Sequence, residues 1–169
     1  MTCLTMKKIF FLLGFILIAT CTFGQIDANI QNIPPFRILR TDSTWFTPAD
    51  IKKHKPVMII YFSPDCSHCQ QLMKEMKPEI RKFGDTQIIM ITYIQPAMLS
   101  AVRAFYHEFG LAKYRNVIVG TEGYTLLVQR YFHIAITPYI AVFNRNGKFI
   151  KGFAKPPAMR ELISVATKA

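Results

Sequence analysis

The chain has 169 residues, of which 51% are hydrophobic, and a formal net charge of +11. This length suits one domain with a substantial core and excludes an array of several domains. Its basic residues are scattered, with Lys52-Lys53-His54-Lys55 the densest cluster. We interpret that cluster as a solvated surface and expect no nucleic-acid partner, with an acidic protein or an anionic membrane surface as the alternative partner.

The N-terminal segment has the pattern of an export signal. Lys7 and Lys8 precede an apolar run over 9–19, which is about half the ~20 residues of a membrane-spanning helix. Cleavage after Gly24 would remove residues 1–24 as a signal peptide and leave 25–169 as a single domain with a charge of +9. The alternative is a lipoprotein signal ending before Cys21, which would attach the chain to a membrane through a lipidated Cys21. Either form predicts a periplasmic or secreted protein.

The rest of the chain alternates between strand and helix patterns. An extended lead-in covers 34–39, and Thr47 followed by Pro48 opens a short helix. We then expect, in order, a buried strand over 56–62, a helix over 66–81, a strand over 87–94, a helix over 96–109, a short edge strand over 116–119, a helix over 125–132, a β-hairpin of 139–143 and 148–153 around an Asn-Gly turn, and a helix over 157–167. This order predicts an α/β fold, with helices on both faces of a mixed central sheet.

Two cysteines lie where the first buried strand meets its helix, in the sequence Cys66-Ser67-His68-Cys69. Thiols at this spacing can close a disulfide, and the N–H groups and dipole of a helix N-terminus stabilise a thiolate at the first of them. Cys3 leaves with the signal, and Cys21 is either lost or acylated, so this is the one remaining pair. A single close pair in an exported chain favours a redox-active centre over a structural disulfide framework.

These features together resemble the thioredoxin fold. The resemblance rests on the apolar strand ending in the Cys66–Cys69 motif, on the Thr137-Pro138 step and on the terminal hairpin and helix. It implies a three-layer thioredoxin-like sandwich. The lead-in with Pro35-Phe36 and the export signal further resemble the extracytoplasmic TlpA-like and ResA-like thiol-disulfide oxidoreductases. The resemblance therefore implies an enzyme that exchanges disulfides with the thiols and disulfides of partner proteins.

The resemblance also assigns roles to residues. Cys66 would attack a partner and form a mixed disulfide, and Cys69 would resolve it; beyond this redox-active disulfide we expect no cofactor and no metal. Pro138 would follow a cis peptide bond that faces the cysteines, and the backbone of Thr137 would pair with an extended substrate segment. The alternative role of Pro138 is that of an ordinary proline at the start of a strand.

His68 lies between the two cysteines and is expected to tune them. An imidazole near the Cys66 thiolate stabilises the reduced form, which makes the disulfide more oxidising. Related reductases usually carry Pro here, whereas disulfide-forming and isomerising members often carry His. The alternative is an exposed polar side chain with little effect. Asp65 would disfavour the Cys66 thiolate by charge, although its simpler role is that of a helix cap.

The chain departs from the family pattern at three positions. Ile60 stands where thioredoxins carry a buried acid, and Leu72 stands where ResA-like proteins carry a glutamate. Asp65 replaces the usual aromatic residue before the first cysteine. Cys69 therefore has no obvious proton acceptor, which keeps open a thioredoxin-fold adaptor with slow redox chemistry.

The sequence leaves three alternatives open: a copper carrier, a structural zinc site and a peroxiredoxin. A copper carrier would use Met73, Met76 and the cysteines, because thioether and thiolate both favour cuprous ion, but Sco-like copper proteins have a cysteine spacing that is one residue longer. A structural zinc site would need a second pair of cysteines. A peroxiredoxin would carry Thr where Ser63 stands. The remaining histidines are isolated in sequence and are interpreted as ordinary surface or core residues: His54, His107 and His133.

Overall fold

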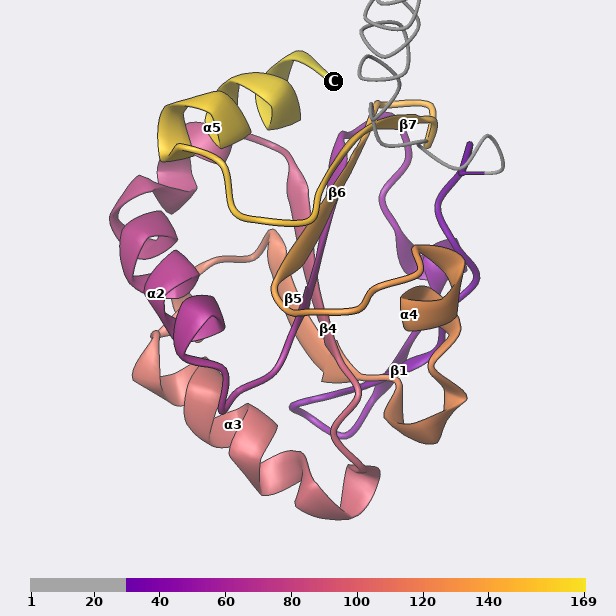
Figure 1. The fold of residues 1–169 in the computed structure, drawn as a ribbon, viewed down its shortest axis with the longest axis vertical. Coiled ribbons are helices and arrows are strands. Elements are labelled where there is room, and N and C mark those ends of the chain that lie inside the picture. The colour runs from indigo at the N-terminus through magenta and orange to yellow at the C-terminus, as the bar shows by residue number, and fades with distance from the viewer. Residues whose placement is uncertain (1–29) are drawn as a thin grey trace, which may run out of the picture.

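The computed structural model describes residues 30–169, which form a seven-stranded sheet with helices on both faces (Figure 1). The expected signal peptide over 1–24 and Cys21 lie outside the described residues. The strands are β1 (Ile38–Arg40), β2 (Trp45–Phe46), β3 (Val57–Phe62), β4 (Gln87–Thr92), β5 (Val117–Thr121), β6 (Tyr139–Phe143) and β7 (Phe149–Phe153). Their order across the sheet is β2-β1-β5-β4-β3-β6-β7. The predicted α/β sandwich with a mixed sheet is confirmed.

The centre of the sheet consists of three parallel strands. Every residue of β3 and β4 is buried, as expected for apolar strands that are covered on both faces. β3 pairs in parallel with β4, and β4 pairs in parallel with β5. Parallel strands all start at one edge of a sheet and end at the opposite edge. Cys66 follows the carboxyl end of β3 and therefore lies at the edge where β4 and β5 also end.

The helices divide the core into two layers. The α-helices are α2 (Ser67–Met76), α3 (Leu99–Glu108), α4 (Leu127–Tyr131) and α5 (Met159–Lys168). Helices α2, α3 and α5 cover one face of the sheet, whereas α4 and the N-terminal segment with Phe36 cover the other (Figure 1). Short 3-10 helices complete the chain: η1 (Pro48–Asp50), η2 (Lys77–Phe83), η3 (Pro96–Met98), η4 (Leu111–Lys113) and η5 (Gly123–Thr125).

The helix that follows β3 is shorter than the predicted range of 66–81. Helix α2 ends at Met76, and the chain continues as the 3-10 helix η2. Pro78 accounts for this change because it has no N–H to donate to the carbonyl four residues earlier. Gly84, with φ of 59°, then turns the chain toward β4.

Strand β5 was predicted at the edge of the sheet, and that prediction is wrong. β5 lies between β4 and β1, because the extended lead-in forms β1 and pairs antiparallel with β5. A Cβ atom at Gly120 would lie 2.8 Å from the carbonyl oxygen of Leu39. Glycine at this position therefore permits the close approach of β1.

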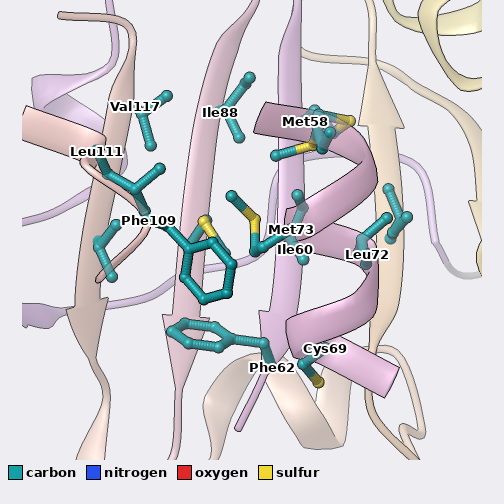
Figure 2. Close-up of a cluster of buried hydrophobic side chains, with 14 of the residues drawn as sticks. Met58, Ile60, Phe62, Cys69, Leu72, Met73, Ile88, Phe109, Leu111 and Val117 are labelled. Carbon is teal, nitrogen blue, oxygen red and sulfur yellow. The ribbon is translucent and has the colours of Figure 1, made fainter. Parts of the chain in front are cut away.

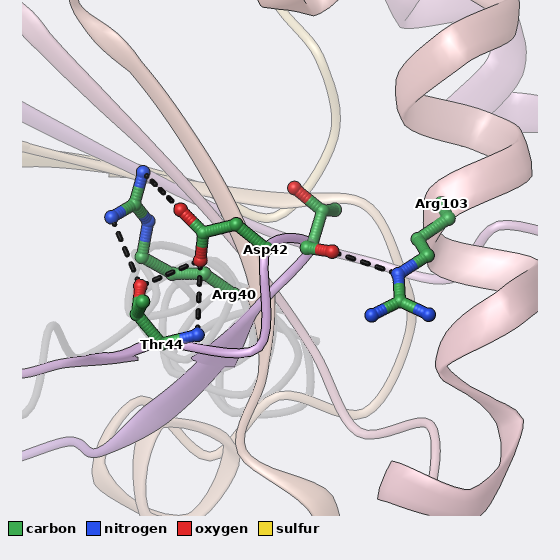
Figure 3. Close-up of polar contacts among 5 residues, drawn as sticks. Arg40, Asp42, Thr44 and Arg103 are labelled. Carbon is green, nitrogen blue, oxygen red and sulfur yellow. Dashed lines mark hydrogen bonds and ion pairs between the residues drawn. The ribbon is translucent and has the colours of Figure 1, made fainter.

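The turn between β1 and β2 is held by a polar cluster (Figure 3). The Asp42 carboxylate accepts hydrogen bonds from the hydroxyl and the N–H of Thr44, at 2.6 and 3.0 Å, and pairs with Arg40 at 3.2 Å. The Thr44 hydroxyl bond is the main reason that the pKa of Asp42 is lowered. Arg103 of α3 donates to the carbonyl oxygen of Thr41 at 2.7 Å, which ties the turn to the helical layer.

The C-terminal hairpin and helix match the prediction closely. β6 pairs antiparallel with both β3 and β7. In the turn, the side-chain oxygen of Asn144 accepts from the N–H groups of Asn146 and Lys148 at 2.9 and 3.0 Å, and Gly147 adopts φ of 72°.

No helix within residues 30–169 has the length and apolar character needed to cross a bilayer.

Candidate active site

Cys66 lies at the N-terminus of α2, on a turn that follows β3. Its N–H donates to the carbonyl oxygen of Ser63 at 3.2 Å, and its own carbonyl accepts from the Gln70 N–H at 3.0 Å. The Gln70 side chain donates back to the carbonyl oxygen of Pro64 at 2.9 Å. These bonds fix the turn on both sides of Cys66, so its sulfur is presented at the open end of the helix.

The surroundings of Cys66 favour its thiolate. Partial burial by itself would raise the pKa of the thiol, but hydrogen bonds from the Cys69 thiol, the Thr137 side chain and the N–H groups of Cys69 and His68 bring the pKa below its ordinary value. As a thiol, Cys66 donates to the carbonyl oxygen of Thr137 at 3.5 Å. The same sulfur therefore has a partner in either protonation state.

Cys69 has the opposite environment. It lies in the first turn of α2 with a relative exposure of 1%, in the same apolar cluster as Ile60 and Leu72 (Figure 2). Burial raises the pKa of the Cys69 thiol to about 12, and the neighbouring Cys66 adds to this rise. Ile60 and Leu72 are themselves buried, so the apolar cluster that contains Cys69 has no acid at either of these two positions.

The structure brings the Thr137-Pro138 step to the cysteines. The peptide bond between these two residues is cis, and it lies between α4 and β6, at the start of the strand that pairs with β3. Cys66 and Thr137 are 71 residues apart in sequence and are joined by the contact to the Thr137 carbonyl oxygen. Pro138 is buried, and Thr137 is half-buried beside it.

His68 and Asp65 are both exposed at the mouth of the site. The contribution of His68 to the lowered pKa of Cys66 comes from its backbone N–H. Its side chain lines the grooves described below. Whether the imidazole itself tunes the cysteines stays a prediction.

Two grooves flank the segment before Pro138. One, of about 510 Å³, is lined by apolar residues that include Leu72 and Pro138 and by the charged residues Glu75 and Lys155. The other, of about 650 Å³, is lined largely by aromatic and aliphatic side chains: Tyr61, Tyr93, Ile134 and Ile136 among them. His68, Ile136 and Thr137 line both grooves. Ile136 is 60% exposed and is a large apolar side chain that the two grooves share.

A buried polar network supports the second groove, and no sequence pattern predicted it. The Tyr61 hydroxyl donates to the Glu122 carboxylate at 2.9 Å, and the same carboxylate accepts the Val128 N–H of α4 at 3.0 Å. Gln129 lies 3.5 Å from the Tyr61 hydroxyl and donates to the carbonyl oxygen of Ile134 at 3.3 Å. The network thus connects β3 to the loop that carries Thr137. Burial, followed by the charge of Glu122, raises the pKa of Tyr61.

The residues considered for metals are dispersed or buried in the core. Met73 and Met76 are fully buried in the apolar cluster between α2 and the sheet. His107 lies on α3 with its ring against Tyr106, and His54 and His133 lie on separate loops. Within residues 30–169, no group of three or more His, Cys, Asp or Glu side chains is arranged to hold a metal ion.

Comparison with known proteins identifies the domain. The thioredoxin-like domain family matches residues 50–166. A secreted disulfide oxidoreductase of Mycobacterium tuberculosis, homologous to E. coli DsbE, is 14% identical with a TM-score of 0.65 over 79% of this chain and 96% of its own. Copper-bound ScoI of Arabidopsis thaliana is 15% identical with a TM-score of 0.63 over 82% and 96%.

A third similar structure is a peroxiredoxin-like protein from Aquifex aeolicus, which is 14% identical with a TM-score of 0.66 over 81% of this chain and 84% of its own. No curated protein matches the sequence. At these identities the solved structures show a shared fold, and the chemistry has to be argued from the side chains at the site.

Proposed function

The chain belongs to the thioredoxin-like domain family, and on this premise we propose that it is an extracytoplasmic thiol-disulfide oxidoreductase that exchanges disulfides with partner proteins. The observation that carries the proposal is the contrast between two adjacent thiols. The pKa of Cys66 is lowered at an accessible helix end, whereas the pKa of buried Cys69 is raised to about 12. Such a pair separates a nucleophile from a resolving thiol.

In the first step, the Cys66 thiolate attacks one sulfur of a partner disulfide. A bond forms between Cys66 and that sulfur, the partner's own disulfide breaks, and its second sulfur leaves as a thiolate that takes a proton. In the second step, Cys69 loses its proton and attacks the Cys66 sulfur. The Cys66–Cys69 disulfide forms, the partner leaves with two thiols, and two electrons have passed from this protein to the partner. The reverse sequence oxidises a partner dithiol.

The order of these steps follows from the interaction between the two sulfurs. Before capture, Cys66 holds the pKa of Cys69 up, both through a hydrogen bond and through its charge. Once Cys66 is part of a mixed disulfide, it carries no charge and no longer competes for the proton. The pKa of Cys69 then falls, although burial still opposes its ionisation. Ionisation of Cys69 is therefore favoured only after Cys66 has captured a partner.

The partner segment would lie along Thr137. An extended chain at this position would pair with the Thr137 backbone, with its cysteine over Cys66 and its flanking side chains in the two grooves beside Ile136. The apolar walls of both grooves favour aliphatic or aromatic residues on either side of the reactive cysteine.

Export would place this chemistry outside the cytoplasm. The pattern over 1–24 supports a secreted or periplasmic protein, or a membrane-attached lipoprotein if Cys21 is acylated. Mass spectrometry of the mature N-terminus distinguishes Gln25 as the first residue from an acylated Cys21.

Trapping of partners tests the proposal. In Cys69→Ser, the first step proceeds and the second does not, so mixed disulfides with partner proteins should accumulate. Cys66→Ser lacks the nucleophile and should accumulate none. Non-reducing electrophoresis followed by mass spectrometry reads out both variants. Equal trapping by the two variants, or no trapping by either, would contradict the roles given to the cysteines.

A copper or metal carrier is the second candidate, and the similarity to copper-bound ScoI supports it. Cys66 and Cys69 would supply thiolates, and His68 would be the nearest imidazole in sequence. Titration with cuprous ion under anaerobic conditions, against a competing chelator, separates the two functions. Tight one-to-one binding without disulfide exchange would favour the carrier.

A thioredoxin-fold adaptor with slow redox chemistry is the third candidate. The apolar cluster of Cys69 favours it, because Ile60 and Leu72 stand in that cluster at the two positions where an acid could remove the Cys69 proton. Steady-state turnover with a protein disulfide and a reductant such as dithiothreitol tests it. Partner binding without turnover would favour the adaptor.

A further inference from the structure

Positive charge is concentrated at the edge of the sheet where the parallel strands begin, which is opposite the cysteines. Residues 52–55 precede β3, Arg115 precedes β5, and Arg145 follows β6, which is antiparallel to β3. These segments therefore meet at the edge where the parallel strands begin. We call Lys52, Lys53, Lys55, Arg115 and Arg145 the basic pole. It lies a β3 length from Cys66, about 20 Å for six residues.

Two shallow grooves join the residues of the basic pole. Lys52 and Lys55 line both of them, with Arg145 in the one of about 430 Å³ and Arg115 in the one of about 390 Å³. Lys52, Lys53, Arg115 and Arg145 are exposed, and Lys55 is half-buried. The cations thus form one continuous surface drawn from three separate segments of the chain.

The charges of this surface are only partly neutralised. Asp85 pairs with Arg145 at 3.3 Å, and the Asp50 carboxylate accepts the N–H and hydroxyl of Thr47. Within the described part of the chain, the three lysines of the basic pole form no ion pair with any carboxylate. Five cations therefore face two carboxylates, and the excess is available to an external anion.

The chain enters the domain at this same edge. Ile33 lines the groove of Lys52 and Arg145, and Asn32 bridges to Lys148 in the turn between β6 and β7. Cys21 precedes Ile30 by nine residues, a span of at most ~30 Å even when fully extended. A chain attached to a membrane through its N-terminal segment would therefore present the basic pole toward the lipid.

We propose that the basic pole is a docking surface for anionic phospholipid headgroups, which holds the domain on a membrane with Cys66 directed away from it. Phosphate groups are the complementary charges that a membrane surface offers, and each lysine or arginine near such a surface contributes to binding. The position of the N-terminal segment at this edge favours a membrane over an acidic protein as the occupant. Binding of the basic pole to a membrane does not depend on the thiol chemistry of Cys66 and Cys69.

The test is co-sedimentation of the full chain with vesicles of phosphatidylcholine, with and without phosphatidylglycerol. The variant Lys52→Gln/Lys53→Gln/Lys55→Gln is compared with Lys74→Gln/Arg130→Gln/Arg160→Gln, which removes three charges from α2, α4 and α5. The N-terminal segment is the same in all three proteins. Exchange with glutathione disulfide and circular dichroism confirm that each variant is folded.

The basic-pole variant should lose binding to the anionic vesicles by about tenfold or more, while the control variant binds like the unchanged chain. Added salt should weaken the binding of the unchanged chain, since the interaction is between surface charges. Equal binding to neutral and anionic vesicles, or equal losses in the two variants, would overturn the proposal. Retention of the unchanged chain on immobilised polyglutamate, together with no binding to the anionic vesicles, would also overturn it, in favour of an acidic protein partner.

Discussion

The sulfur of Cys66 lies 3.5 Å from the carbonyl oxygen of Thr137. This contact joins the helix N-terminus after β3 to the residue before the cis proline, so the nucleophile and the proposed substrate-pairing backbone occupy one place. A partner segment that pairs with Thr137 would bring its own sulfur to Cys66 without further rearrangement of the chain.

Replacement of His68 by proline should lower the reduction potential of the Cys66–Cys69 pair. An imidazolium near the Cys66 thiolate stabilises the reduced form, and the variant also loses the His68 N–H that helps to lower the pKa of Cys66. We expect a decrease of tens of millivolts, on a scale where ~30 mV corresponds to ~1.4 kcal/mol. Equilibration with glutathione buffers measures the potential.

His68→Ala keeps the N–H and removes the imidazole, and it is therefore the matched control. A lowered potential in both variants would assign the effect to the side chain, and a lowered potential in His68→Pro alone would assign it to the backbone. A potential that is unchanged or raised in His68→Pro would contradict the prediction.

Replacement of Leu72 by glutamate should accelerate the second step. Leu72 shares the apolar cluster of Cys69, and a carboxylate there would provide the proton acceptor that the chain lacks. Stopped-flow release of a thiol from a mixed disulfide on Cys66 measures the rate. We expect a faster release at neutral pH, together with a loss of stability because a polar group is buried.

Leu72→Gln is the control for this prediction, since it buries a polar group of the same size that accepts no proton. If glutamine accelerated release as much as glutamate, increased access of solvent to Cys69 would explain the effect and proton transfer would not.

Tyr61 and Glu122, which share a buried hydrogen bond, should contribute unequally to the free energy of unfolding. Tyr61→Phe removes one hydroxyl and leaves Glu122 bonded to the Val128 N–H, so we expect a loss of about 0.5–1.5 kcal/mol. Glu122→Ala removes the acceptor of both bonds and leaves two buried donors without it, so the loss should be larger, about 2 kcal/mol or more. Urea denaturation of the reduced proteins measures both free energies of unfolding.

A double-mutant cycle measures the interaction energy between Tyr61 and Glu122. The combined variant should be less destabilised than the sum of the single losses, because both single changes break the same hydrogen bond. Simple additivity would show that Tyr61 and Glu122 act separately.

The features predicted from the sequence are those set by local pattern. The apolar runs of β3 and β4 specified buried parallel strands, and the Asn-Gly turn specified the hairpin of β6 and β7. The position of Cys66 at a strand-to-helix junction followed from the change of hydrophobic period between β3 and α2. Each of these signals is contained within one element or two consecutive elements, so the sequence expresses it directly.

The features that the sequence did not predict depend on long-range contacts. Strand β1 has three residues and no strong alternation, and its pairing beside Gly120 became evident only from the structure. Glu122 had no sequence pattern that distinguished it from a surface carboxylate, since its partners Tyr61 and Val128 come from two other elements. The basic pole likewise combines segments that are far apart in the chain.

The pH dependence of alkylation tests the central claim most directly, which is that one thiol of the pair ionises readily and the other does not. Iodoacetamide is applied to the reduced Cys69→Ser and Cys66→Ser variants, and to the unchanged protein with mass spectrometric assignment of each site. Cys66 should titrate with a pKa below the ~8.5 of an unperturbed cysteine. Its rate of alkylation should stop rising once the pH exceeds the pKa of Cys66. Cys69 of the unchanged protein should stay protected until the pH approaches its own pKa of about 12. Equal pKa values at the two sites, or a lower pKa at Cys69, would contradict the account.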